Sequence, residues 1–273
     1  MSHTAFRLPY LASLRVTGAD AHGFLQNQLS ADLRLVSPTQ GLLAGWHDPK
    51  GRVLAFLRVL PVGDGFLLVM HAGLLQTVAQ RLRMFVLRAQ VTIEDGPPVY
   101  GAASASLPSL LPPEAVIAPH TAHGDDATPQ VLPAVTGARL SALRLPGGWL
   151  VVGQLDAPEA SDDPHAVADW ERAELEAGIP EVYPETSGEF VAQMLNLERI
   201  GAVSFTKGCY PGQEIVARAH HLGRVKRRAQ VFRLSGPPPQ PGAALEEPAG
   251  TVVRAVACDG ESLVMAVVAQ PDD

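Results

Sequence analysis

Short apolar segments bounded by Gly, Pro, Asn and Asp recur along the chain, and this pattern predicts strands. The predicted strands are residues 42–47, 52–60, 66–70, 91–93, 140–145, 149–152, 225–234, 251–257 and 262–269. Two connections have the composition of tight turns, namely Asp-Pro-Lys-Gly at 48–51 and Pro-Gly-Gly at 146–148. The pattern therefore predicts antiparallel hairpins.

Apolar positions at helical spacing predict helices between these strands. The predicted helices are residues 20–30, 73–85, 165–177 and 213–220. Asp20 has the side chain of a helix N-cap, and Gly178 followed by Pro180 is typical of a helix end. Because helices and strands are interspersed, we expect an α+β fold.

Proline and glycine clusters suggest where the chain divides. Residues 236–242 (Gly-Pro-Pro-Pro-Gln-Pro-Gly) are the strongest linker candidate, and residues 112–133 interrupt the pattern. The strands after the cluster are too few for an independent fold, so we expect them to complete a small barrel that begins near residue 225. We therefore predict an α+β region at 1–224 and a small C-terminal β-barrel at 225–273.

Composition restricts the class of protein. The chain has 273 residues and is 47% hydrophobic, which is enough for a sizeable core. Its apolar runs are shorter than the roughly 18 residues of a membrane span, and its N-terminus lacks a signal-peptide pattern. Two cysteines are too few for a disulfide framework. We expect a cytoplasmic protein without a membrane partner.

Charge is unevenly distributed in this acidic chain, whose net charge is −7. Residues 207–228 contain one acid, Glu214, against six cations: Lys207, Arg218, Arg224, Lys226, Arg227 and Arg228. A basic stretch in an acidic protein fits a small anionic ligand, because arginine binds carboxylates through paired hydrogen bonds. A solvated strand edge protected by cations is the alternative. Direct tRNA contact is possible but less supported.

Residues 207–214 (Lys-Gly-Cys-Tyr-Pro-Gly-Gln-Glu) are the part of the chain richest in chemical groups. The glycines and proline predict a sharp connection into the following helix. Cys209 would then lie just before a helix N-terminus with Lys207 nearby, an environment that favours the thiolate. The alternative is that Cys209 is a small buried residue and the glycines only form a turn.

These residues resemble the YgfZ-type folate-binding proteins, a family related to the glycine-cleavage aminomethyltransferase. The similarity extends over most of residues 14–230. It includes residues 17–20, 25–32, 48–52, Trp170, 176–180, 193–197, 201–205, 207–218 and 226–227. A chance match to this ordered series is improbable.

The resemblance implies a fold, a ligand and a role. Family members form a ring from a bipartite folate-binding region with a ferredoxin-like portion and a C-terminal β-barrel, with the folate in the central hole. The implied role is an accessory protein for iron-sulfur enzymes and, through them, for tRNA modification, with tetrahydrofolate or a derivative as cofactor.

The resemblance also assigns candidate residues. Cys209 is the candidate functional thiol, and Lys207 and Arg218 would tune its charge. Tyr210, Gln213 and Glu214 would position it by hydrogen bonds. The folate ligands would be an indole that stacks on the pterin and the basic stretch that follows, namely Trp170, Arg224, Lys226 and Arg227. Anchoring of its helix in the core is the alternative role for Trp170.

Two other functions have to be considered. The aminomethyltransferase needs an acidic residue on the helix after its third strand, where this chain has Val78, so we do not expect aminomethyl transfer. Whether the chain is an enzyme of another kind stays open. An iron or zinc site would draw on Cys209, His220, His221 and Cys258, but their spacing is poor and favours, at most, a transient scaffold.

Overall fold

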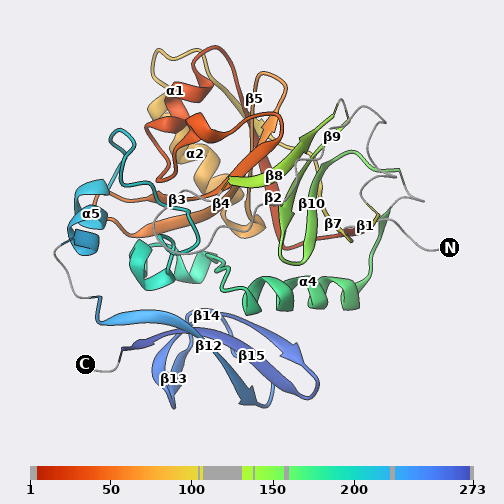
Figure 1. Cartoon of the computed structure of the whole chain (residues 1–273), viewed down its shortest axis with the longest axis vertical. Helices are drawn as coiled ribbons and strands as arrows, with labels where there is room; N and C mark the ends of the chain where they lie inside the picture. The colour runs from red at the N-terminus through yellow and green to blue at the C-terminus, as the bar shows by residue number, and fades with distance from the viewer. Residues whose placement is uncertain are drawn as a thin grey trace.

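The computed structural model describes residues 5–103, 105–106, 131–137, 139–156, 160–221 and 225–270. The chain forms a large curved sheet, a smaller C-terminal sheet and a few helices (Figure 1). The helices are α1 (Ala21–Gln26), η1 (Leu33–Leu35), η2 (Ala72–Leu74), α2 (Leu75–Val86), α4 (Pro164–Glu176), η3 (Pro184–Thr186), η4 (Ala192–Leu195) and α5 (Gln213–His221). The α+β prediction is confirmed.

The large sheet has the strand order β11-β1-β7-β10-β9-β8-β3-β4-β5-β2-β6. Its strands are β1 (Ala5–Arg7), β2 (Leu11–Thr17), β3 (Gln40–His47), β4 (Val53–Val62), β5 (Gly65–His71), β6 (Thr92–Asp95), β7 (Val99–Ala102), β8 (Val131–Thr136), β9 (Leu140–Leu145), β10 (Gly148–Gly153) and β11 (Ala160–Ser161). Two groups of strands join where β3 pairs with β8. The two predicted hairpins are present, with Leu42 opposite Val59 and Leu150 opposite Leu143.

The C-terminal sheet is antiparallel, in the order β12-β15-β14-β13. Its strands are β12 (Arg227–Ser235), β13 (Ala244–Glu246), β14 (Ala249–Cys258) and β15 (Glu261–Ala269). Helix α4 lies between this sheet and the large sheet (Figure 1). The proline-rich residues 236–242 connect β12 to β13 within this sheet, and therefore lie inside the predicted C-terminal unit 225–273 and not at its boundary.

The helix ends depend on contacts that the sequence pattern does not include. Helix α1 ends at Gln26 instead of near residue 30, and the Asp20 side chain makes no cap hydrogen bond. Instead, the Asp20 carboxylate accepts a hydrogen bond from the main-chain N–H of Gln90 at 2.7 Å. Helix α4 is capped by Asp163, which accepts from two main-chain N–H groups of its first turn. The expected end of α4 is confirmed by Gly178, whose φ of +75° suits glycine.

A buried cluster of charges joins the two sheets through α4. Arg58 of β4 donates to Glu181 at 2.7 Å and to Glu174 of α4 at 3.1 Å, and all three side chains are fully buried. Arg254 of β14 donates to Glu174 at 3.3 Å. Arg254 also lies 3.5 Å from Glu171, whose side chain is 23% exposed, so two guanidinium groups face three carboxylates and tie the C-terminal sheet to the core.

Candidate functional site

Three segments that are far apart in the sequence meet around residues 201–213. Ser30, in the loop after α1, donates from Oγ to the carbonyl of Ala202 at 2.6 Å and accepts from the N–H of Gly45 at 2.8 Å. The N–H of Ser204 in turn donates to the carbonyl of Ser30. The loop 26–32, strand β3 and the Lys-Gly-Cys-Tyr segment therefore form one hydrogen-bonded unit.

The hairpin tip 48–51 packs directly against Gly212. The tip is the predicted tight turn, since Asp48 Oδ1 accepts from the N–H groups of Lys50 and Arg52. A Cβ on Gly212 would lie 2.4 Å from the carbonyl oxygen of Asp48 and 2.7 Å from the nitrogen of Gly51, and its φ is +77°. Only glycine fits this approach of two backbones.

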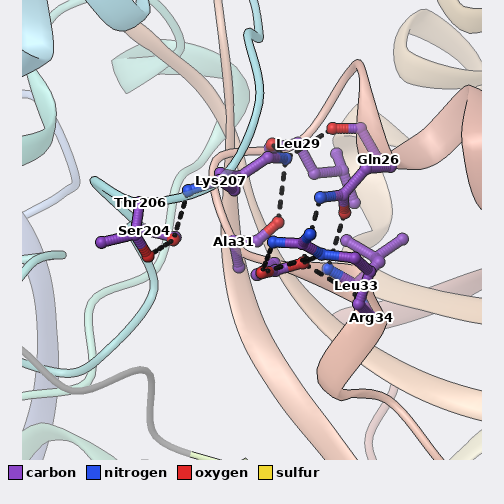
Figure 2. Close-up of polar contacts among 9 residues, drawn as sticks. Gln26, Leu29, Ala31, Leu33, Arg34, Ser204, Thr206 and Lys207 are labelled. Atoms are coloured by element: carbon purple, nitrogen blue, oxygen red, sulfur yellow. Dashed lines mark hydrogen bonds and ion pairs between the residues drawn. The ribbon is translucent and has the colours of Figure 1, made fainter.

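Lys207 points away from solvent into the loop 26–32. Its Nζ donates to the carbonyl oxygens of Gln26, Leu29 and Ala31 at 2.5, 2.5 and 3.0 Å, and the face of the Tyr210 ring is 5.3 Å away. Figure 2 shows the lysine among these acceptors. All three ammonium donors are used within this loop, so Lys207 has no donor left for a hydrogen bond to Cys209, and the tuning of the thiol by its charge stays a prediction.

Cys209 is exposed and lies just before α5, in the place expected from the sequence. The alternative that it is a buried turn residue is therefore wrong. Among the described residues, no hydrogen bond joins Cys209 to Tyr210, Gln213 or Glu214, so the expectation that such bonds position the thiol is not supported, whereas its tuning by the charge of Arg218 stays a prediction. Glu214 is in the first turn of α5, where a negative charge is favourable.

Tyr210 is the other inward-facing residue of the segment. It is buried against His47 of β3, with 5.8 Å between ring centroids. Burial raises the pKa of Tyr210 above its usual value and lowers the pKa of His47 to about 4. The Tyr210 hydroxyl and both His47 ring nitrogens lack a hydrogen-bond partner among the described residues. The pair therefore stays uncharged at neutral pH and holds the segment by packing.

A pocket of about 460 Å³ opens between the large sheet, the end of α4 and the turn at 199–200. Its apolar wall consists of Leu43, Leu132, Leu145, Pro146, Ala177, Ile179 and Ile200. Two cations complete it, Arg144 of β9 and Arg199, and none of its described lining residues is acidic. The pocket can therefore take a flat apolar group and a negatively charged one together.

Trp170 does not line this pocket. It is 1% exposed, meets Phe6 edge to face at 6.1 Å, and covers Gly147 so closely that a Cβ there would lie 2.9 Å from the indole. The alternative interpretation, in which Trp170 anchors α4 in the core, matches this arrangement. The expectation of pterin stacking is not supported, because neighbouring residues cover the indole. Trp170 instead packs its indole against Gly147, in the Pro146–Gly147 turn between β9 and β10.

The basic stretch also lies elsewhere. Lys226 is exposed, and Arg227 donates to the carbonyl of Val267 in the C-terminal sheet. Arg228 binds Glu198 at 2.6 Å, and Arg224 is outside the described residues. Arg144 and Arg199, which do line the pocket, were missed. Arg199 lies two residues after the matched segment 193–197, which is the one sequence signal that could have indicated it.

The four candidate metal ligands are not brought together. Cys258 is buried in the C-terminal sheet, where the guanidinium of Arg233 lies 3.7 Å from its sulfur. His220 stacks on Phe205 with 4.0 Å between ring centroids. The described part of the chain contains no group of three or more His, Cys, Asp or Glu that could hold a metal ion.

The helix that should carry the aminomethyltransferase acid has an apolar residue in its place. Val78 is buried on α2, and α2 contains no acidic residue. The likeness to the transferase therefore concerns the scaffold and not this catalytic group.

Comparisons with known proteins find relatives over nearly the whole chain. A tRNA-modifying protein YgfZ of Cronobacter sakazakii is 30% identical over 285 residues, covering 98% of this chain and 85% of the relative. The protein of the same name from Klebsiella pneumoniae is 32% identical over 289 residues, with coverages of 98% and 86%. No family model matches the sequence.

A solved structure shows the same fold. The glycine cleavage system aminomethyltransferase T of Bartonella henselae superposes with a TM-score of 0.69 at 16% identity, covering 97% of this chain and 78% of that chain. In the described residues, no helix is both long and apolar enough to cross a membrane. The chain has the aminomethyltransferase fold and belongs to the YgfZ family of tRNA-modifying proteins.

Proposed function

We propose that this protein is a folate-binding accessory factor that supports iron-sulfur enzymes and, through them, tRNA modification. The observation that carries the proposal is the pocket, which combines an apolar wall with Arg144 and Arg199. The aminomethyltransferase fold and the family membership support the same role.

The pocket matches the chemistry of a reduced folate. Its volume of about 460 Å³ is within the range of small-molecule sites, roughly 300–1,000 Å³. The pterin and aminobenzoyl rings would pack on the apolar wall, and the glutamate carboxylates would meet the two guanidinium groups. Tetrahydrofolate would supply a one-carbon carrier at this site, while the chain's own residues bind, orient and shield it.

The thiol provides the second part of the proposal. Cys209 is exposed on a segment held by Lys207 and Tyr210, so it is accessible to a partner protein or to a sulfur-containing group. In cells lacking the family member, Cys209→Ser should fail to restore iron-sulfur enzyme activity although the purified variant binds folate normally. Restoration equal to wild type would remove the thiol from the function.

Calorimetric titration with tetrahydrofolate and with its polyglutamates tests the ligand. We expect saturable binding that strengthens with tail length, and a loss of about tenfold or more for Arg199→Gln, as for one charged hydrogen bond. Arg34→Gln is the matched control, because Arg34 is an exposed arginine that pairs with Asp32. Absence of binding to wild type, or equal effects of the two replacements, would contradict the proposal.

A further inference from the structure

The exposed strap of residues 206–209 is held by two inward-facing side chains, Lys207 within it and Tyr210 directly after it. Thr206, Gly208 and Cys209 are exposed, whereas Lys207 between them is 5% exposed. Gly208 adds no packing, because nothing lies within 4 Å of the position of a Cβ there. The place of the Cys209 sulfur therefore depends in part on where the Lys207 side chain ends.

That side chain ends in a cage of main-chain oxygens. The carbonyls of Gln26, Leu29 and Ala31 converge on Nζ at 2.5, 2.5 and 3.0 Å, and the Tyr210 ring covers it at 5.3 Å. Convergent carbonyl oxygens are the surroundings that proteins provide for a desolvated monovalent cation. Three N–H donors meet three acceptors, and the aromatic face adds a favourable electrostatic contact.

The cage is built without help from the lysine. Gln26 donates from Nε2 to Asp32 at 3.0 Å and accepts from the N–H of Leu33 at 2.8 Å. Arg34 donates through Nε and Nη2 to the two Asp32 oxygens at 2.9 and 2.6 Å, and Figure 2 shows Gln26, Leu33 and Arg34 close together on one side of the cage. Hydrogen bonds from Arg34 lower the pKa of Asp32 to about 2, so this brace persists at neutral pH.

The charge state of Lys207 is compatible with a cation site. Burial lowers the pKa of Lys207 to about 8, Asp32 opposes this shift and Arg34 adds to it. Most of the lysine is therefore charged at pH 7. The carbonyl hydrogen bonds favour the charged form further.

We propose that the carbonyls of Gln26, Leu29 and Ala31 form a site for an ammonium-sized monovalent cation, which Lys207 fills from within the chain to hold the Cys209 strap in place. Lys207 is then a positioning residue, and its charge can be supplied by a free cation when the side chain is removed. This inference concerns the loop–strap junction and does not depend on folate binding.

The test compares Lys207→Ala with Lys207→Met in ammonium, potassium or choline chloride at equal ionic strength. Hydrogen–deuterium exchange of residues 26–33 and 202–212 and alkylation of Cys209 by iodoacetamide, all mapped by mass spectrometry, report on the cage and the strap. In choline we expect Lys207→Ala to exchange about tenfold faster than wild type, as for the loss of a charged hydrogen bond. Ammonium should restore slow exchange of the cage residues 26–33 with a saturable dependence, whereas Cys209 alkylation should stay faster than in wild type, because a free cation is not linked to the strap.

Lys207→Met provides the matched control, because its side chain occupies the path of the lysine stem without a charge. It should exchange rapidly in all three salts, and wild type should respond equally to all three. If Lys207→Ala does not fold in choline, its refolding yield in ammonium replaces the exchange measurement. Exchange of residues 26–33 or a yield that is the same in ammonium and choline, or rescue of Lys207→Met as large as that of Lys207→Ala, would overturn the proposal.

Discussion

The buried charge cluster gives a sharp test of how the two sheets are held together. Arg58→Met removes the donor to Glu181 at 2.7 Å and the donor to Glu174 at 3.1 Å. Glu174 keeps Arg254, but Glu181 keeps only the N–H of Val182. One carboxylate is then left buried without an opposite charge.

The expected loss in the free energy of unfolding is about 3–5 kcal/mol, because breaking a buried pair leaves an uncompensated charge. At roughly 2–4 °C per kcal/mol this lowers the Tm by about 10 °C. Urea unfolding at pH 7 measures the loss directly. Arg139→Met is the surface control, and since the side chains of Arg139 and its partner Asp156 are 62% and 77% exposed, it should cost less than about 1 kcal/mol.

A second replacement separates charge from packing. The double variant Arg58→Met/Glu181→Gln keeps Arg254 paired with the buried Glu174 and with the partly exposed Glu171, and removes the unpaired charge of Glu181. It should be more stable than Arg58→Met alone by about 1 kcal/mol or more. A loss below about 1 kcal/mol for Arg58→Met, or a double variant no more stable than the single one, would show that an unpaired buried charge on Glu181 does not cause the destabilisation.

Three further predictions concern the candidate site. Gly212→Ala should destabilise the fold by more than about 2 kcal/mol, because the added Cβ would meet the backbone of Asp48 and the residue has a φ of +77°. Gly208→Ala is the control and should change stability by less than about 0.5 kcal/mol. Equal losses of the two variants in urea unfolding would contradict this prediction. Burial lowers the pKa of His47 from about 6.5 to about 4. The neutral imidazole therefore contributes about 3 kcal/mol to the free energy of unfolding above pH 6.5, and this contribution is lost as the pH falls toward 4. His47→Leu should therefore show a flatter dependence of the urea midpoint between pH 7 and 4.5, and an unchanged slope would count against burial as the cause. Trp170→Phe should cost about 1–3 kcal/mol of stability and leave tetrahydrofolate affinity unchanged, and a tenfold weaker affinity would return Trp170 to the ligand site.

The elements of the fold could be predicted because their signals are local. The hairpin from residue 140 to 153 was recognised from two apolar runs around Pro-Gly-Gly, and α4 from its spacing and its terminal Gly178. Local signals failed where a distant group intervened. The carboxylate of Asp20 binds the N–H of Gln90, 70 residues away, instead of capping α1.

The α+β class, the family and the place of Cys209 just before α5 followed from the sequence alone, because the turn residues, helix signals and motifs that indicate them are adjacent in the chain. Only the tertiary structure decided what the charged and aromatic side chains contact. Lys207 is directed into a loop nearly 180 residues away, Trp170 is covered by the sheet, and the pocket takes its cations from Arg144 and Arg199. The surroundings of a side chain depend on segments that meet only when the chain folds, so its sequence neighbours could not reveal them.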